Sequence, residues 1–288
     1  MYSKTYKATI KTITRSPLTW AAVALLIGVA IYSSMRGSYG KVDMSTYKMI
    51  WDTDPRFTID YPLYIQHLRN ALYTGSLMLY PAPVFCVIVS GVVLARDWHD
   101  NFFEIERAGG VKPRQYFISR FVAVLSFVSV ITLITGFVAF HVYCLSRGGV
   151  ESLSLWTYLF DSTVRILRIF FLAVFPGILI FVSFTFAVGS VFKNGIIGTL
   201  SGLALVVFKY LSQGILRFRL PDFYHKYLSP TPAYLYQFWG YYDTEWFFEK
   251  TQYNPFTTQQ MLLCLFCLYL ISSIFIILSY FSIKKRRV

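Results

Sequence analysis

The chain has 288 residues, of which 56% are hydrophobic and only 14% are charged, and its formal net charge is +13. Soluble domains carry about 25% charged residues, so this chain has too few to cover a large soluble fold. Its charges are bunched between long apolar runs, and about 20 helical residues cross a bilayer core of about 30 Å. The composition therefore predicts an all-α integral membrane protein and argues against a soluble globular fold.

Six apolar runs between flanking charges predict six transmembrane helices in one transmembrane domain, residues 1–288. The predicted spans are residues 17–35, 70–95, 121–146, 169–192, 194–213 and 259–283. The fifth span contains Lys209, which we expect at the outer end of its helix with the ammonium group at the lipid headgroups.

The distribution of Lys and Arg predicts the orientation of the spans. The side that receives residues 1–15, 96–120, 193 and 284–288 carries a net charge of +10, against +3 on the other side. Cytoplasmic loops are enriched in Lys and Arg, so both termini are predicted to be cytoplasmic. A cleaved signal peptide is the alternative for the N-terminus, but its basic region is long and no A-x-A-like site follows.

Residues 1–15 are predicted to form an interfacial helix on the inner membrane surface. Its cations, which recur every three or four residues, are Lys4, Lys7, Lys11 and Arg15. Its apolar stripe consists of Tyr6, Ile10 and Ile13. Ser16 and Pro17 are a helix-start signal, so we expect the chain to bend there from lying on the membrane to crossing it. A frayed basic tail is the alternative.

Prolines and glycines indicate where space opens between spans. Pro81 and Pro83 interrupt the second span, so we expect a kink or unwound turn that is structural or lines a cavity. Gly198 and Gly202 form a G-x-x-x-G pattern in the fifth span, which permits close packing within the subunit or at a dimer seam. These four residues are the candidates for a substrate cavity or dimer seam.

Residues 96–120 form the longest predicted cytoplasmic segment between spans. A helix over 97–108 would place three apolar side chains on one face, namely Trp98, Phe102 and Ile105. The charged side chains expected at the rim of that face are Glu104, Glu106 and Arg107. Gly109 and Gly110 are expected to end this helix, and Pro113 to start the next one, which continues into the third span. The apolar face either docks on another protein or lies against the membrane.

Residues 211–257 form an outer segment in which about a third of the residues are aromatic. Tyr and Trp prefer the membrane interface, so we expect short helices folded back onto the membrane.

Motifs for catalysis or cofactor binding are missing from the sequence. It contains no G-x-x-x-x-G-K-[ST], no H-E-x-x-H and no G-x-S-x-G. The four cysteines, which are Cys86, Cys144, Cys264 and Cys267, all lie in apolar runs and are expected to be buried small hydrophobic residues. We therefore expect no catalytic residue, metal site or bound cofactor in this chain, and no nucleic-acid partner.

The order of these features resembles the permease subunits of type-two ATP-binding-cassette (ABC) exporters. The resemblance is carried by Ile10-Lys-Thr-Ile-Thr-Arg-Ser-Pro-Leu-Thr-Trp20 and by the stretch from Glu104 to Phe121. The second stretch looks like the family's acidic helix, glycine turn and Pro-x-x-x-Tyr/Phe return into the third span, with Gly109-Gly110 where the family commonly has Gly-Thr. The resemblance implies six spans, a coupling helix between spans two and three, and re-entrant helices before the last span.

The resemblance also implies a non-catalytic subunit of the bacterial cell membrane. It would pair with a second permease, identical or homologous, and with two copies of a separate ATPase that binds ATP and Mg. The residues that would contact the ATPase are Trp98, Phe102, Glu104, Ile105, Glu106, Arg107, Gly109 and Gly110. The exported substrate would be amphipathic: a drug-like compound, a bacteriocin-type peptide or a lipid. The alternatives are an ATPase-independent carrier or channel and a membrane-embedded enzyme or sensor.

Overall fold

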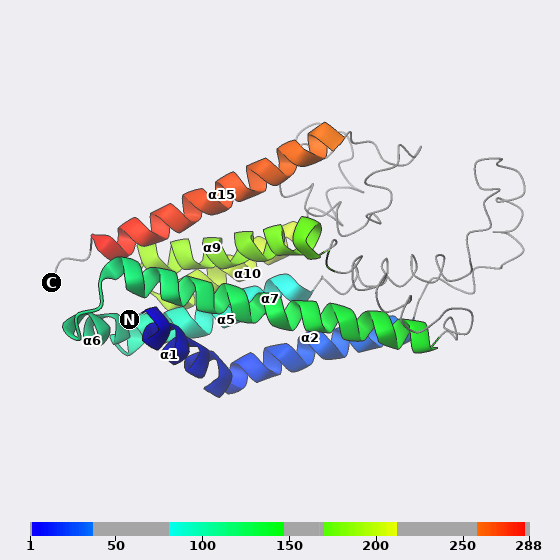
Figure 1. The fold of residues 1–288 in the computed structure, drawn as a ribbon, viewed down its shortest axis with the longest axis horizontal. Coiled ribbons are helices and arrows are strands. Elements are labelled where there is room, and N and C mark those ends of the chain that lie inside the picture. The colour runs from blue at the N-terminus through cyan, green and yellow to red at the C-terminus, as the bar shows by residue number, and fades with distance from the viewer. Residues whose placement is uncertain (1, 37–80, 147–166, 168–169, 212–257, 286–288) are drawn as a thin grey trace, which may run out of the picture.

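A computed structural model describes residues 2–36, 81–146, 167, 170–211 and 258–285. Within these residues the chain forms eight α-helices, one π-helical turn and no strand, which confirms the all-helical class (Figure 1). The helices are α1 (Tyr2–Arg15), α2 (Pro17–Arg36), α5 (Pro81–His99), α6 (Phe102–Ala108), α7 (Pro113–Ser146), α9 (Phe175–Val191), α10 (Gly195–Leu211) and α15 (Thr258–Lys284), with the π-helical turn η2 (Phe170–Val174) preceding α9. The predicted outer segments, 36–69 and 211–257, lie almost entirely outside the described residues.

Pro17 and Pro113 begin helices, as the sequence predicts, and a polar side chain caps a third helix. α1 ends at Arg15 and α2 begins at Pro17, and the two helices meet at an angle of 69°. Pro113 begins α7, which continues without a break for 34 residues to Ser146. The side-chain oxygen of Asn194 accepts hydrogen bonds from the backbone N–H groups of Ile196 and Ile197 at 2.8 and 3.2 Å, which caps the start of α10.

Pro81 and Pro83 lie in the first turn of α5, where a proline costs the helix little because the first N–H groups have no helical partner. The predicted kink concerns the chain around and before Pro81, and residues 37–80 lie outside the described residues. At its other end α5 continues to His99, beyond the predicted limit of the second span at residue 95.

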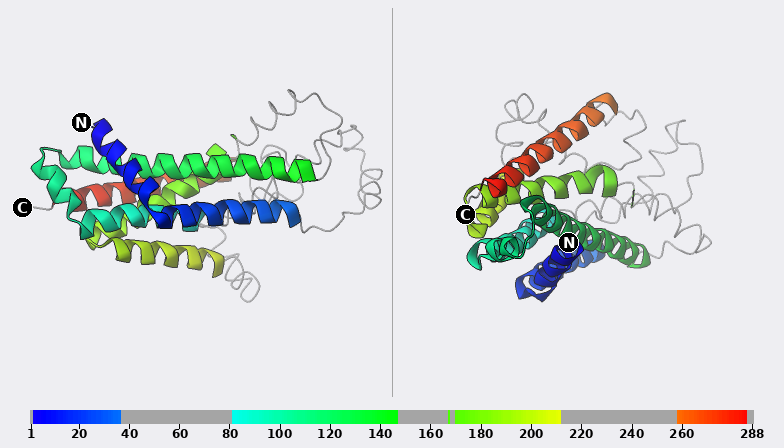
Figure 2. Two further views of the ribbon diagram at one scale, coloured as in Figure 1. Left: turned by 90° about the horizontal axis from the view of Figure 1, so that it is seen from below. Right: turned by 60° about the vertical axis from the view of Figure 1, so that its left-hand side comes forward.

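The long helices form a bundle with α9 at its centre (Figures 1 and 2). α9 packs against α5, α7, α10 and α15, and most of its side chains are buried. A helix that is apolar on all sides is expected in such a central position. α2 packs against α5 and α7 on the opposite side of α5, and α1 crosses the bundle beside α7 and α5.

Glycines on one face of α10 allow it to approach α5 and α9 closely. A Cβ atom added to Gly198 would lie 2.9 Å from the Gly189 Cα and from the Thr185 carbonyl oxygen on α9. One added to Gly202 would lie 2.6 Å from the Thr185 hydroxyl and 2.8 Å from a Val87 methyl group. Both glycines are buried within one subunit. The G-x-x-x-G pattern therefore serves packing within the subunit, which was one of its two predicted roles. In this structure the glycine face of α10 does not line an open cavity.

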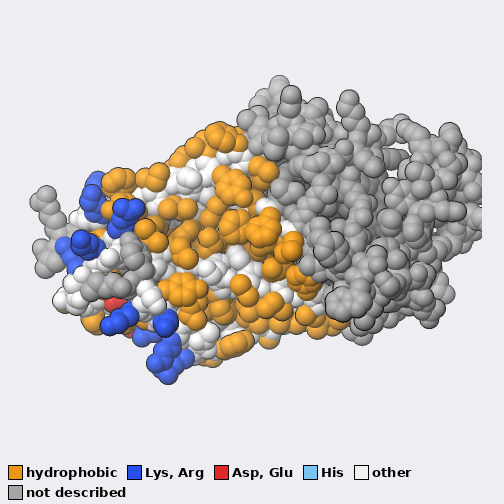
Figure 3. All heavy atoms as spheres, in the orientation of Figure 1, with side chains coloured by type: hydrophobic (Ala, Val, Ile, Leu, Met, Phe, Trp, Pro, Cys, Tyr) orange, Lys and Arg blue, Asp and Glu red, His pale blue; other side chains and the backbone are white. Residues whose placement is uncertain are grey.

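The apolar surface of the described bundle has the character of a membrane protein. Three helical segments are long and apolar enough to cross a membrane: Ala82–His99, Pro113–Ala139 and Leu265–Lys284. The bent pair α1 and α2 passes the same test if it is taken as one span, whereas α9 and α10 are apolar but shorter. Hydrophobic side chains cover the length of the bundle, and Lys and Arg gather at the end near α6 (Figure 3). The number of six spans remains a prediction.

Candidate functional site

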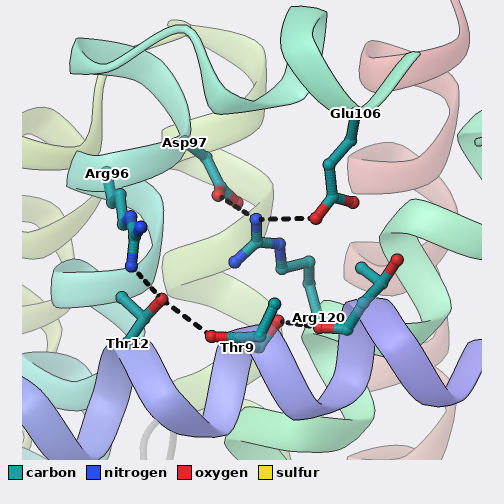
Figure 4. Close-up of polar contacts among 8 residues, drawn as sticks. Thr9, Thr12, Arg96, Asp97, Glu106 and Arg120 are labelled. Carbon is teal, nitrogen blue, oxygen red and sulfur yellow. Dashed lines mark hydrogen bonds and ion pairs between the residues drawn. The ribbon is translucent and has the colours of Figure 1, made fainter. Parts of the chain in front are cut away.

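The buried side chain of Arg120 organises the end of the bundle at which α6 lies. Arg120, in the second turn of α7, has only 1% of its surface exposed. Its Nη2 atom lies 3.2 Å from Asp97 Oδ1 at the end of α5 and 3.7 Å from Glu106 Oε1 on α6 (Figure 4). A single guanidinium group thus joins three helices that are consecutive along the chain.

The two carboxylates differ in distance and burial. The side chain of Asp97 is 6% exposed and that of Glu106 is 14% exposed, and the contact of Glu106 with Arg120 is the longer one. Coulombic attraction decreases with distance and with access of water. Of the two ion pairs, the one between α6 and α7 is therefore the weaker, and the one between α5 and α7 the stronger.

Aromatic rings extend the contacts of Arg120. Its guanidinium carbon lies 4.7 Å from the centre of the Phe102 ring and 5.0 Å from that of Tyr116. Arg96 on α5 approaches the same Phe102 ring at 4.8 Å. Distances below about 6 Å allow cation–π attraction. Phe103, the neighbour of Phe102, is buried and meets Tyr116 edge to face, with 4.9 Å between ring centres. These contacts hold α6 against α5 and α7.

Arg96 also links this cluster to α1. Its Nη1 donates a hydrogen bond to the Thr12 hydroxyl on α1 (Figure 4). The buried face of α1 is lined by Thr5, Thr9, Thr12 and Ile13. The hydroxyls of Thr9 and Thr12 donate to the carbonyls four residues earlier, Thr5 and Ala8, so these groups are satisfied within their own helix. Hydroxyl groups that are satisfied in this way let α1 pack closely against α7.

A small cavity beside Arg120 shows that two further helices reach the site. It is lined by Leu94, Asp97, Trp98, Phe103, Tyr116, Phe117, Arg120, Phe186 and Ile283. Phe186 belongs to α9 and Ile283 to the last turn of α15. The Nε and Nη1 atoms of Arg120 are buried and have no hydrogen-bond partner among the described residues. Residues from five helices therefore surround this guanidinium.

α6 is bounded by two residues with left-handed backbone conformations. Asn101, immediately before it, has φ 51°, and Gly110, two residues after its end, has φ 84°. The backbone N–H groups of Gly109, Gly110 and Val111 donate to carbonyls in the last turn of α6, which ends the helix as the glycine pair predicts. α6 is thus a separate seven-residue unit with a sharp change of chain direction on each side.

The outer surface of α6 differs from the predicted apolar face. The chain changes direction between His99 and Phe102, so Trp98 lies on α5 while Phe102 and Ile105 lie on α6, and a continuous helix over 97–108 was wrong. Phe102 lies among guanidinium groups, and Glu106 points inward to Arg120 and not to a rim. Ile105 is 62% exposed, and Glu104, Gly109 and Gly110 are exposed around it.

Several residues of this site were missed by the sequence analysis, namely Thr12, Arg96, Asp97, Phe103, Tyr116 and Arg120. A signal for the ion pair exists in the sequence. Asp97 and Arg120 are opposite charges at the facing ends of two successive apolar runs. If those runs are antiparallel neighbouring helices, the two side chains lie at the same end of the bundle. The remaining predicted candidates, Pro81, Pro83, Gly198 and Gly202, lie on α5 and α10 and do not line the cavity beside Arg120.

In the part of the chain that the structure describes, no cluster of three His, Cys, Asp or Glu residues that could hold a metal ion occurs. Cys86 is buried in α5, and the side chain of Cys264 lies outside the described set. No protein-family model matches the chain, and no curated protein shows significant similarity to it.

Proposed function

We propose that the chain is the transmembrane permease subunit of a type-two ABC exporter, and that α6 is the helix gripped by its ATPase. In this proposal six spans cross the bacterial cell membrane, and both termini and α6 face the cytoplasm. Two permease subunits, identical or homologous, work with two ATPase subunits that bind ATP and Mg. The substrate is amphipathic: a drug-like compound, a bacteriocin-type peptide or a lipid.

The observation that carries the proposal is that two side-chain contacts attach α6 to α7. A motor outside the membrane can move transmembrane helices only through an element that it can reach and that is firmly joined to those helices. α6 presents Ile105 outward, while Glu106 and Phe103 hold its inner face to Arg120 and Tyr116 on α7. The resemblance of residues 104–121 to the coupling region of the family supports the same assignment.

The contacts of Arg120 suggest how a displacement of α6 would reach the membrane. A force on α6 acts on Arg120 through Glu106, and Asp97 holds the same guanidinium to α5. Because α7 is one unbroken helix, movement of its first turns reaches the part that crosses the membrane. Asn101 and Gly110 have left-handed conformations at the two ends of α6, and in this proposal the chain would bend there when α6 moves.

Ile105, and not Phe102, is the residue of α6 on which docking is best tested. Phe102 is partly covered by Arg96 and Arg120, so changing it disturbs the site itself. Ile105 is exposed, and burying a large aliphatic side chain in an apolar cleft contributes about 1.5–3 kcal/mol. We therefore expect Ile105→Asp to weaken the complex with the ATPase at least about tenfold.

The experiment is co-purification of the full-length chain with the ATPase encoded beside it, followed by substrate-stimulated ATP hydrolysis. Lys112→Asp, also exposed and close to α6, is the control for introducing an acidic residue. The proposal requires loss of the complex in Ile105→Asp and retention in Lys112→Asp. If the unmodified chain moves substrate without ATP and binds no ATPase, it is a carrier or channel. Normal assembly and hydrolysis by Ile105→Asp would remove α6 from the interface.

A further inference from the structure

The orientation of α1 in the structure differs from that of an ordinary interfacial helix. Its buried face, formed by Thr5, Thr9, Thr12 and Ile13, lies against α7 and α5 and not against lipid. Its cations Lys4, Lys7, Lys11 and Arg15 are all exposed on the opposite face. The predicted apolar stripe is thus largely used for packing within the protein, and what α1 offers to its surroundings is positive charge.

The charge on this face is not neutralised by neighbours within its own segment. No Asp or Glu occurs before Asp43 in the sequence. Within the described residues, none of the four cations takes part in an ion pair with an acidic side chain. Four cations on one side of a 14-residue helix form a stripe about 16 Å long, at a rise of about 1.5 Å per residue.

If α2 crosses the bilayer, the bend between α1 and α2 places this stripe at the height of the lipid headgroups. α2 is the apolar partner of the bent pair, and α1 leaves it at 69°, closer to the membrane plane than to its normal if α2 crosses the bilayer. Trp20, one turn into α2, is 51% exposed, and its indole N–H donates to the Thr14 carbonyl at 2.7 Å. An exposed Trp with a polar contact is typical of the membrane interface.

The direction of the basic face distinguishes a lipid partner from a cytoplasmic one. α1 packs against the sides of α7 and α5, which run along the bundle axis (Figure 2). The face opposite to that contact therefore points sideways, where the headgroups around the bundle lie, and not along the axis toward the cytoplasm. We propose that the basic face of α1 is a binding surface for the headgroups of anionic phospholipids.

This surface has a defined consequence for lipid selectivity. Lys and Arg near an anionic membrane surface contribute attraction that falls off within a Debye length. The protein should hold anionic lipid next to α1 in preference to zwitterionic lipid, and salt should weaken that preference. Because α1 is joined to Arg96 through Thr12, the lipid contact also fixes one side of the Arg120 site.

The test uses the full-length protein in phosphatidylcholine vesicles with trace spin-labelled phosphatidylglycerol or, separately, spin-labelled phosphatidylcholine. The fraction of motionally restricted label gives the relative association constant of the two lipids. Lys7→Gln/Lys11→Gln is compared with Lys112→Gln/Arg114→Gln, which removes the same charge from an exposed segment after α6. Lys7→Arg/Lys11→Arg keeps the charge and controls for folding.

The expected result is a preference for phosphatidylglycerol that falls at least about threefold in Lys7→Gln/Lys11→Gln and is retained in the other two variants. An unmodified protein without preference would overturn the inference. An equal fall in Lys112→Gln/Arg114→Gln would overturn it as well, because the attraction would then come from the general field of the basic end. Unchanged lipid preference in Lys7→Gln/Lys11→Gln would also overturn it, because the anionic lipid would then be held by other residues. The measurement needs no ATPase, so it is independent of the proposed function.

Discussion

Arg120 and Asp97 form a buried ion pair, with 3.2 Å between Nη2 and Oδ1, at the end where α5 and α7 meet α6. Between them lie 22 residues, which include α6 and both of its left-handed flanking residues. The pair thus closes a loop whose middle part, around Ile105, is exposed. Burying two charges is costly unless their partners are in place, so the neighbours of this pair are sensitive to substitution.

Removal of the guanidinium should have a large effect. Arg120→Met leaves Asp97 and Glu106 buried near an apolar side chain, and removal of one partner from a buried pair costs about 3–5 kcal/mol. The thermal stability of the purified protein in detergent measures this cost. Arg114→Met, an exposed control on the same helix, should change stability by less than about 0.5 kcal/mol. The triple variant Arg120→Met/Asp97→Asn/Glu106→Gln should recover part of the loss, and no recovery would argue against a role of the ion pairs.

Neutralising Glu106 should loosen α6 more than the rest of the bundle. Its contact with Arg120 is the longer and the more exposed of the two, so Glu106→Gln should cost about 1 kcal/mol and leave the α5–α7 pair intact. Amide hydrogen exchange should rise about fivefold in residues 102–108 with little change in α7. Lys112→Gln is the control from the adjoining loop. Faster exchange throughout α7 as well would mean that α6 does not move as a separate unit.

A methyl group in the α9–α10 contact should be destabilising. Gly198→Ala places a Cβ 2.9 Å from backbone atoms of α9, and overpacking against backbone typically costs about 1–3 kcal/mol. Gly136→Ala on α7 is the matched control, because an added Cβ there has no heavy atom within 4 Å. That variant should be neutral or more stable by up to about 1 kcal/mol, since Ala favours helix over Gly. Equal melting temperatures for the two variants would contradict the close packing of α10.

The sequence predicts the helices of this protein well where the signals are local. Pro17 and Pro113 begin helices, Gly109 and Gly110 end one, and the apolar runs coincide with α2, α7, α9, α10 and α15. These signals depend only on neighbouring residues, through the missing proline N–H and the conformational freedom of glycine. The side of α10 that carries Gly198 and Gly202 was also identified as a packing face.

The candidate site was predicted less well because it depends on which helices are neighbours. Helical spacing places Trp98, Phe102 and Ile105 on one face only if the helix is continuous, and the left-handed conformation of Asn101 interrupts it. The spacing also gives no means of choosing between Phe102 and its neighbour Phe103 as the residue that faces the bundle. In the sequence Arg120 is one of the charges that flank the third predicted span, and its burial by residues from five helices is a property of the tertiary structure.

The unbroken course of α7 has a mechanical consequence. Its 34 residues form a rod about 51 Å long, with the Arg120 cluster near one end and the close Ala30–Ala139 contact with α2 toward the other. A rigid helix of this length transmits a tilt at one end to its other end. A tilt of about 5° around one end displaces the other by about 4 Å, which is most of one helical turn of about 5.4 Å. Sub-ångström adjustments at the ion pairs can therefore appear, enlarged, at the far side of the bundle.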